Sequence, residues 1–139
     1  LLEDAIASTD SGWALTQCAV WDRQSIGLGS PFRAGHELLA FCRGPKFLWN
    51  GRKDIGNVLA YRWPYGEHEH HPTEKPVALL RDLLELFTSK DDVVLDAFTG
   101  SGSLLVAAKK LGRRAIGIEI EPKYCEIAVR RLRQEVMQF

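Results

Sequence analysis

Two carboxylates and two glycines are spaced along the second half of the chain in a way that suits binding of a charged nucleoside. Asp96 lies in a short apolar run, and Gly100 and Gly102 follow it closely. Glycines let a backbone turn sharply and approach a ligand without a Cβ clash. A carboxylate at Asp96 can bind a cationic amine, and Glu119, at the end of a second apolar run, can accept hydrogen bonds from ribose hydroxyls.

A dinucleotide is a weaker match to the same glycine turn. The dinucleotide fingerprint needs a third glycine three residues after Gly102, where this chain has Leu105. A large side chain at that position suits a core contact between helix and sheet, and Asp96 before the turn would repel a pyrophosphate. A ligand with an amino-acid tail and a nucleoside therefore fits better. The residues alone leave open a tight turn that binds nothing.

A second feature, His71-Pro-Thr-Glu-Lys-Pro76, stands just before a helical pattern. The two prolines stiffen the loop, and Thr73 can cap the helix that follows. Taken alone, the segment is better explained as a proline-bounded helix start with a solvated Lys75.

The elements that must position these residues alternate regularly. Helical spacing of apolar residues predicts helices over residues 76–88, over 103–111 and from Pro122 onward. The apolar runs 93–97 and 115–120 are typical of strands buried on both faces of a parallel sheet. This alternation predicts a right-handed βα unit with parallel strands.

The first half of the chain is rich in Trp, Gly and Arg and predicts strands and loops. Strands are expected over residues 13–21, 36–43 and 58–63, and loops over 25–35, 44–57 and 64–72. The expected domain organisation has a strand and loop segment over 1–43, a short insertion over 44–70 and a ligand-binding βα region over 71–139.

The motifs HPTEKP, DAFTGSG, GIEIEPKY and A-x-x-R-L, in that order from His71 to Leu132, resemble the N4-cytosine/N6-adenine DNA methyltransferases of bacteria and phages. They are similar to the circularly permuted branch, in which the cofactor motifs come last. A weaker similarity covers GLGSPFRAGHE over residues 27–37. The resemblance implies an α/β fold: a partial Rossmann-like S-adenosylmethionine-dependent methyltransferase sheet with flanking helices, without the N-terminal strands of the full fold.

The resemblance also implies roles for single residues. Asp96 would hold the amino group of S-adenosylmethionine, Glu119 its ribose hydroxyls, and Ile120 would pack on the adenine. Phe98 and the glycine turn would line the methionine and sulfonium part, and Lys75 would lie near the carboxylate. The residues expected to bind the cofactor are Thr73, Lys75, Asp96, Phe98, Thr99, Gly100, Ser101, Gly102, Glu119 and Ile120.

The family's catalytic motif, Asp/Asn/Ser-Pro-Pro-aromatic, is absent, because the sequence contains no adjacent pair of prolines. Pro64-Tyr65 is a poor substitute, since Trp63 precedes it instead of Asp or Asn. We therefore expect no catalytic residue in this chain and no methyl transfer by the chain alone. A fragment, a split enzyme and a degenerate remnant stay open, as do a homodimer and a complementing N-terminal half.

Double-stranded DNA is the expected partner, although a related fold could act on RNA. Residues expected to contact DNA are Arg33, Arg52 and Lys53, the last two inside the insertion with interleaved aromatic residues. Packed tryptophans with solvated arginines explain that insertion equally well. The 18 basic and 18 acidic residues cancel, which argues against a general nucleic-acid binder.

Other features predict little further chemistry. The His and Glu residues at 67–71 suit a solvated loop better than a metal site, so no metal is expected. The cysteines Cys18, Cys42 and Cys125 are far apart and are expected to be reduced and mostly buried. No apolar run is long enough to cross a bilayer, and a bacterial or phage-encoded cytoplasmic protein is the expected class.

Overall fold

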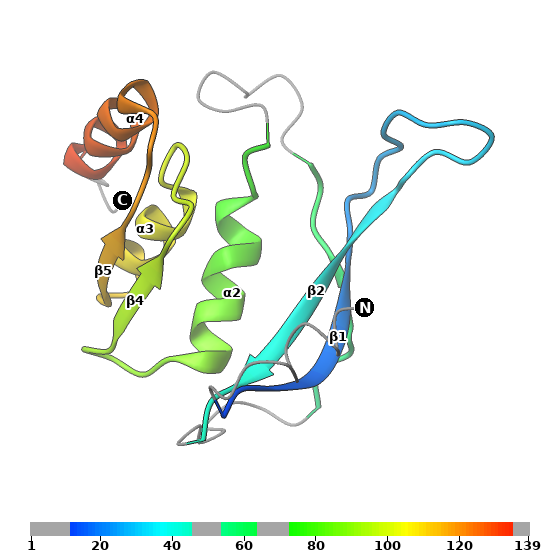
Figure 1. The fold of residues 1–139 in the computed structure, drawn as a ribbon, viewed down its shortest axis with the longest axis horizontal. Helices are drawn as coiled ribbons and strands as arrows, with labels where there is room; N and C mark the ends of the chain where they lie inside the picture. The colour runs from blue at the N-terminus through cyan, green and yellow to red at the C-terminus, as the bar shows by residue number, and fades with distance from the viewer. Residues whose placement is uncertain (1–11, 46–53, 64–72, 135–139) are drawn as a thin grey trace, which may run out of the picture. The chain divides into compact units, whose positions relative to one another are not determined.

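The computed structural model describes residues 12–45, 54–63 and 73–134, which Figure 1 draws in colour. The chain divides into two compact units, Leu1–Arg62 and Trp63–Phe139. The boundary between the units falls inside the insertion expected over residues 44–70, of which 46–53 and 64–70 lie outside the described residues.

The first unit contains a three-stranded sheet in the order β2-β1-β3. Strand β1 (Ala14–Asp22) pairs antiparallel with β2 (His36–Arg43), and β3 (Val58–Ala60) pairs parallel with β1. Trp21 is fully buried, and its indole Nε1 donates a hydrogen bond to the carbonyl of Tyr61 at 2.8 Å. The three expected strands are confirmed, with β3 shorter than expected because β1 ends at Asp22 and offers no further partner.

Backbone hydrogen bonds close the loop between β1 and β2. The N–H of Arg23 donates to the Gly35 carbonyl at 3.0 Å, and that of Gly27 donates to Ala34 at 2.8 Å. Leu28 and Phe32 are almost fully exposed on this loop. The expected loop is thus confirmed as a hairpin connection with two large apolar side chains in solvent.

The second unit alternates helices and strands in the predicted order: α2 (Val77–Phe87), β4 (Val93–Asp96), α3 (Ser103–Lys110), β5 (Arg114–Gly117) and α4 (Pro122–Arg133). Strands β4 and β5 pair in parallel, with Val93 opposite Arg114 and Asp96 opposite Gly117. Figure 1 shows α3 crossing from the end of β4 to the start of β5, as a βα unit requires.

A small core joins α2, α3 and β4. Buried Leu84, Val94, Ala107 and Ala108 form its centre, and partly buried residues of both helices pack around them. Leu105 of α3 packs against the sheet, since a Cβ at Gly117 would lie only 2.7 Å from the Leu105 Cδ1. The core contact expected for Leu105 is therefore confirmed.

The opposite face of the β4–β5 sheet is uncovered. Val93, Leu95, Ile116 and Ile118 are 50%, 62%, 55% and 55% exposed, whereas Val94, which alternates with them, is 8% exposed. The prediction that both strands are buried on both faces is wrong for the described residues. Among the described residues, α2 and α3 pack on the Val94 side of β4, and all four residues of β5 are exposed. Parallel sheets normally have helices on both faces.

Two further expectations need correction. The strand expected over residues 115–120 ends at Gly117, because its partner β4 ends at Asp96 and turns away. Cys18 and Cys42 are exposed and Cys125 is half-buried, so the expectation of mostly buried thiols is wrong, although all three are free. Among the described residues, no helix has the length and hydropathy of a membrane span.

Candidate ligand-binding site

The turn between β4 and α3 depends on glycine conformations. Gly100 and Gly102 have φ angles of 53° and 84°, in the left-handed region that side chains rarely adopt. A Cβ at Gly102 would lie 2.8 Å from the Cβ of Ala128 in α4. The sequence led us to expect that these glycines make room for a ligand, but at Gly102 the room is taken by helix α4.

Asp96 ends β4 beside this turn. Its carboxylate Oδ1 accepts a hydrogen bond from the backbone N–H of Phe98 at 3.1 Å. Its backbone carbonyl accepts a hydrogen bond from the hydroxyl of Thr99 at 3.0 Å. The carboxylate is therefore oriented at the carboxyl end of the strand, where open α/β sheets bind their ligands.

Glu119 is held by two backbone N–H groups. Its Oε2 accepts a hydrogen bond from Gly100 at 2.7 Å, and its Oε1 accepts one from Glu121 at 2.9 Å. A carboxylate has about four acceptor positions, so one carboxylate can accept hydrogen bonds from backbone N–H groups and from hydroxyls together. The glycine turn after β4 and the segment after β5 are thereby joined through one side chain.

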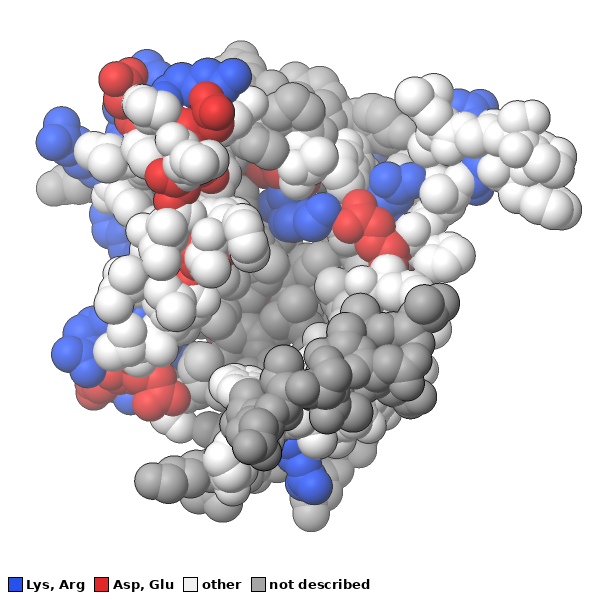
Figure 2. All heavy atoms as spheres, viewed as in Figure 1, with Lys and Arg blue, Asp and Glu red and all other residues white. Residues whose placement is uncertain are grey.

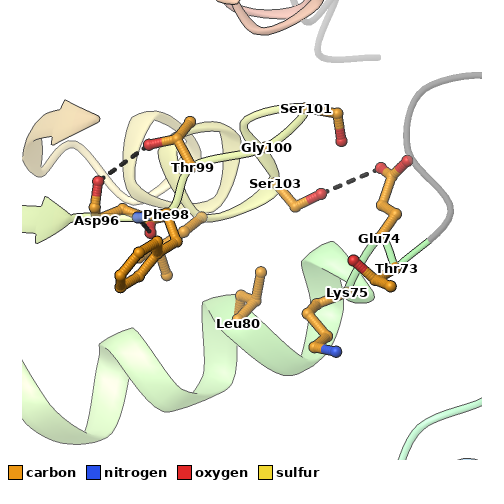
Figure 3. Close-up of a pocket in the computed structure, with 11 residues that line it drawn as sticks. Thr73, Glu74, Lys75, Leu80, Asp96, Phe98, Thr99, Gly100, Ser101 and Ser103 are labelled. Atoms are coloured by element: carbon orange, nitrogen blue, oxygen red, sulfur yellow. Dashed lines mark hydrogen bonds between the residues drawn. The ribbon is translucent and has the colours of Figure 1, made fainter. Parts of the chain in front are cut away.

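A cavity of about 300 Å³ lies between this turn and the segment before α2 (Figure 3). That volume is at the lower end of the range found for small-molecule sites. The residues that line it are Thr73, Glu74, Lys75, Leu80, Asp96, Phe98, Thr99, Gly100, Ser101, Ser103 and Leu104. Gly102, Glu119 and Ile120 of the predicted set do not line this cavity.

Two apolar side chains of the predicted set stand in solvent near the turn. Phe98 and Ile120 are 92% and 91% exposed. Exposed apolar side chains at a binding site can provide contact surface for a ligand or a partner. Both residues are thus available to pack on an aromatic ring such as adenine.

Other predicted residues are already engaged within the protein. Thr99 and Ser101 are buried, and the Ser101 hydroxyl accepts a hydrogen bond from Arg131 at 2.9 Å. The ammonium of Lys75 lies 5.6 Å from the centroid of the Trp63 ring. Figure 3 shows the Lys75 ammonium directed away from the glycine turn, so only its stem faces the cavity.

Three residues near the site had no predicted ligand role: Glu74, Ser103 and Arg131. Glu74 lines the cavity, and its Oε1 lies 2.7 Å from Nη2 of Arg131 in α4. Ser103 also lines the cavity and donates a hydrogen bond to Glu74 at 3.1 Å. Glu74 belongs to the motif HPTEKP and Arg131 to the motif A-x-x-R-L, and membership of these motifs was the signal that the sequence offered.

The residues expected to contact DNA are only partly described. Arg33 lies on the exposed loop between β1 and β2, and its Nε donates a hydrogen bond to the Gly27 carbonyl at 2.6 Å. Arg52 and Lys53 lie outside the described residues, as do Pro64, Tyr65 and the His and Glu residues at 67–71. Within residues 12–45, 54–63 and 73–134, no group of His, Cys, Asp or Glu residues suits a metal ion. Figure 2 shows acidic and basic side chains intermixed on the viewed face of the described residues.

Comparison with known proteins identifies a family over nearly the whole chain. The model of the N6_N4_Mtase family, described as DNA methylase, matches residues 4–130. The type II methyltransferase M.HindIII of Haemophilus influenzae is 31% identical over 141 residues, covering 91% of this chain and 46% of that protein. The DNA adenine methyltransferase YhdJ of Escherichia coli is 38% identical over 98 residues, covering 68% of this chain and 33% of that protein.

A solved structure shows the same fold. The M1.HpyAVI–SAM complex superposes with a TM-score of 0.75 and 27% identity, covering 88% of this chain and 64% of that one. The expected α/β methyltransferase fold is thus confirmed, and this chain contains part of it. The chain spans less than half the length of the two curated relatives above.

Proposed function

Because this chain belongs to the DNA methylase family, we propose that it is the S-adenosylmethionine-binding part of a DNA methyltransferase. The enzyme would transfer a methyl group to N6 of adenine or N4 of cytosine. The observation that carries the proposal is the carboxylate of Glu119, which the N–H of Gly100 orients at the turn that follows Asp96. The M1.HpyAVI relative, whose structure contains SAM, supports the choice of cofactor.

The residues at the site fit S-adenosylmethionine. The Asp96 carboxylate suits the ammonium of its amino-acid tail, and the Glu119 carboxylate, an acceptor at both oxygens, suits the two ribose hydroxyls. Exposed Phe98 and Ile120 offer apolar surface for the sulfonium and the adenine. Thr73 and the stem of Lys75 line the tail end of the cavity, and Lys75 would have to turn inward to reach a carboxylate.

The bound cofactor supplies an electrophilic methyl group on a sulfonium. The exocyclic amine of adenine or cytosine is a poor nucleophile because its lone pair is delocalised into the ring. Family members use the Asp-Pro-Pro-Tyr-type motif to accept the amine's N–H bonds and to stack on the flipped base. This chain has no such motif, so we propose that its own residues bind and orient the cofactor and carry out no base chemistry.

A complementing polypeptide half is the proposed partner within the enzyme. One face of the β4–β5 sheet exposes four apolar side chains, Val93, Leu95, Ile116 and Ile118. A parallel sheet normally buries such side chains under helices. The curated relatives are more than twice as long as the parts of them that match this chain. We assign this face to the part of the enzyme that carries the catalytic motif, and a homodimer is the competing outcome.

Double-stranded DNA is the proposed substrate. The loop between β1 and β2 presents exposed Phe32 next to Arg33, a pairing of apolar and cationic groups that suits bases and phosphates. Arg52 and Lys53 of the proposed target-recognition insertion, residues 44–70, are assigned to phosphate contacts. The strand and loop segment 1–43 and the cofactor region 71–139 complete the proposed organisation. A bacterial or phage-infected cytoplasm, where the cofactor and DNA occur together, is the proposed location.

A methyl-transfer assay tests this proposal. Duplex DNA is incubated with tritium-labelled S-adenosylmethionine and the 139-residue chain, with and without a separately produced N-terminal half that carries an Asp-Pro-Pro-Tyr-type motif. We expect transfer only when both halves are present. Transfer by the chain alone would refute its assigned role as a part without base chemistry. Cofactor binding without transfer in the presence of a complementing half would instead identify a non-catalytic remnant.

A further inference from the structure

A buried ion pair joins helix α4 to the segment before α2. Nη2 of Arg131 lies 2.7 Å from Oε1 of Glu74, and the two side chains are 14% and 8% exposed. Nη1 of the same guanidinium donates to the carbonyl of Ser101 at 3.0 Å and to its hydroxyl at 2.9 Å. Ser103 completes the cluster, since its hydroxyl donates to Glu74 at 3.1 Å and lies 3.3 Å from Nη1.

Three of the four residues of the cluster form part of the cavity wall. Glu74, Ser101 and Ser103 all line the cavity, while Arg131 does not. Figure 3 shows the Glu74 carboxylate directed toward Ser103, with Thr73 and Lys75 on either side of Glu74 in the chain. Through Arg131, the cluster therefore links the segment around Glu74 to the Ser101 side of the glycine turn.

Stability alone does not account for this arrangement. Oε2 of Glu74 is buried and has no hydrogen-bond partner among the described residues. A buried ion pair offsets the cost of desolvation only when its remaining acceptors are satisfied, and an apolar pair of similar volume is often as stable. The residues that the pair holds in place all line one end of the proposed cofactor cavity.

We propose that the Glu74–Arg131 pair positions the end of the site that binds the amino-acid tail of the ligand. Glu74 and Arg131 act as positioning residues through Thr73, Ser101 and Ser103. The inference rests on the proposed function, because the tail belongs to S-adenosylmethionine. It predicts that loss of the pair weakens ligands that carry the tail and spares ligands that lack it.

Two ligands separate this role from general loss of structure. S-adenosylhomocysteine carries the tail, while 5′-methylthioadenosine keeps the nucleoside and the thioether but has no tail. Both are titrated by calorimetry into the wild-type chain and into the variants Glu74→Gln, Arg131→Lys and Ser103→Ala. We expect each variant to bind S-adenosylhomocysteine more weakly, by about tenfold or more for the first two. Affinity for 5′-methylthioadenosine should stay within about twofold of wild type.

The variant Asp82→Asn is the matched control. Asp82 forms an ion pair with Arg81 at 2.8 Å on the exposed surface of α2, with side chains 49% and 38% exposed for arginine and aspartate. This variant should leave both affinities unchanged. Thermal unfolding followed by circular dichroism reports whether each variant is folded. If Glu74→Gln and Arg131→Lys do not fold, Ser103→Ala still tests the cluster, because it leaves the ion pair in place.

Three results would overturn the inference. Equal weakening of both ligands would show a general structural role, and unchanged S-adenosylhomocysteine binding in folded variants would show no role. Loss of the folded state in all three variants would make the cluster a folding determinant only. If the wild-type chain binds neither ligand, the proposed function itself fails, and that result is visible before any variant is compared.

Discussion

The backbone N–H of Gly100 donates a hydrogen bond to Oε2 of Glu119 at 2.7 Å, joining the turn after β4 to the segment after β5. The second carboxylate oxygen accepts from the N–H of Glu121. The acid that would bind ribose is therefore oriented before any ligand arrives. Pre-orientation of this kind lowers the entropic cost of binding.

Replacing Glu119 should separate its two roles. Glu119→Ala removes the ribose acceptor and leaves the N–H of Gly100 without this partner, so S-adenosylmethionine should bind roughly 10- to 100-fold more weakly. Glu119→Gln keeps one acceptor oxygen and should give an intermediate loss. Isothermal titration calorimetry measures both, with Glu121→Gln as the control at an exposed neighbouring carboxylate. Equal affinities for all three variants and wild type would contradict the assignment.

Gly102→Ala should destabilise the fold more than Gly112→Ala. Both glycines have positive φ angles, 84° and 68°, which cost an alanine about 1–2 kcal/mol. Of the two positions, only Gly102 places the new Cβ against a neighbour, Ala128, and such overpacking adds roughly 1–3 kcal/mol. Urea unfolding of the two variants measures the difference. A similar loss at the two positions would show that the contact with α4 yields without cost.

Leu95 and Val94 are adjacent in β4 but face opposite sides, so their substitutions should act differently. Val94→Ala removes core volume and should lower the free energy of unfolding by roughly 2 kcal/mol. Leu95→Lys places a charge on the uncovered face and should cost the isolated chain less than about 1 kcal/mol. In the two-half assay, Leu95→Lys should prevent methyl transfer while cofactor binding by the chain persists. Normal complementation by this variant would mean that the face is not the contact surface.

The charge-reversal variant Arg52→Glu/Lys53→Glu should change how DNA binding depends on salt. Each phosphate contact contributes a slope of about −0.9 to log K against log salt, so losing two contacts should flatten the slope by roughly two units. Fluorescence anisotropy of labelled duplex DNA over a range of salt concentrations gives the slope. Lys110→Glu, an exposed lysine at the end of α3, is the control with no expected change. An unchanged slope in the double variant would remove both residues from the DNA interface.

The elements around the glycine turn were predictable because local sequence determines them. Gly102 ends the turn, Pro122 begins α4, and the apolar spacing of α2 matches one helical face. Asp96 and Glu119 could also be placed, since Asp96 ends β4 and Glu119 follows shortly after the end of β5. These features depend on a few neighbouring residues, which the sequence displays directly.

Features that depend on distant contacts were not predictable. The pair formed by Glu74 and Arg131 joins residues from separate elements, and no periodic pattern connects them. The strand after α3 looked longer than it is, because its length depends on where β4 ends. Leu95 and Ile116 looked buried because apolar strands usually are, while their exposure depends on which segments cover that face of the sheet.

The most direct test of the account is calorimetric titration of S-adenosylmethionine and S-adenosylhomocysteine into the folded chain. We predict saturable binding of one ligand per chain with a dissociation constant on the order of micromolar, as is common for enzyme ligands. The binding should be weakened by Glu119→Ala. The assignment of the site would be contradicted if the folded chain gave no binding heat with either ligand at saturating concentration and the Glu119→Ala variant gave the same result as wild type.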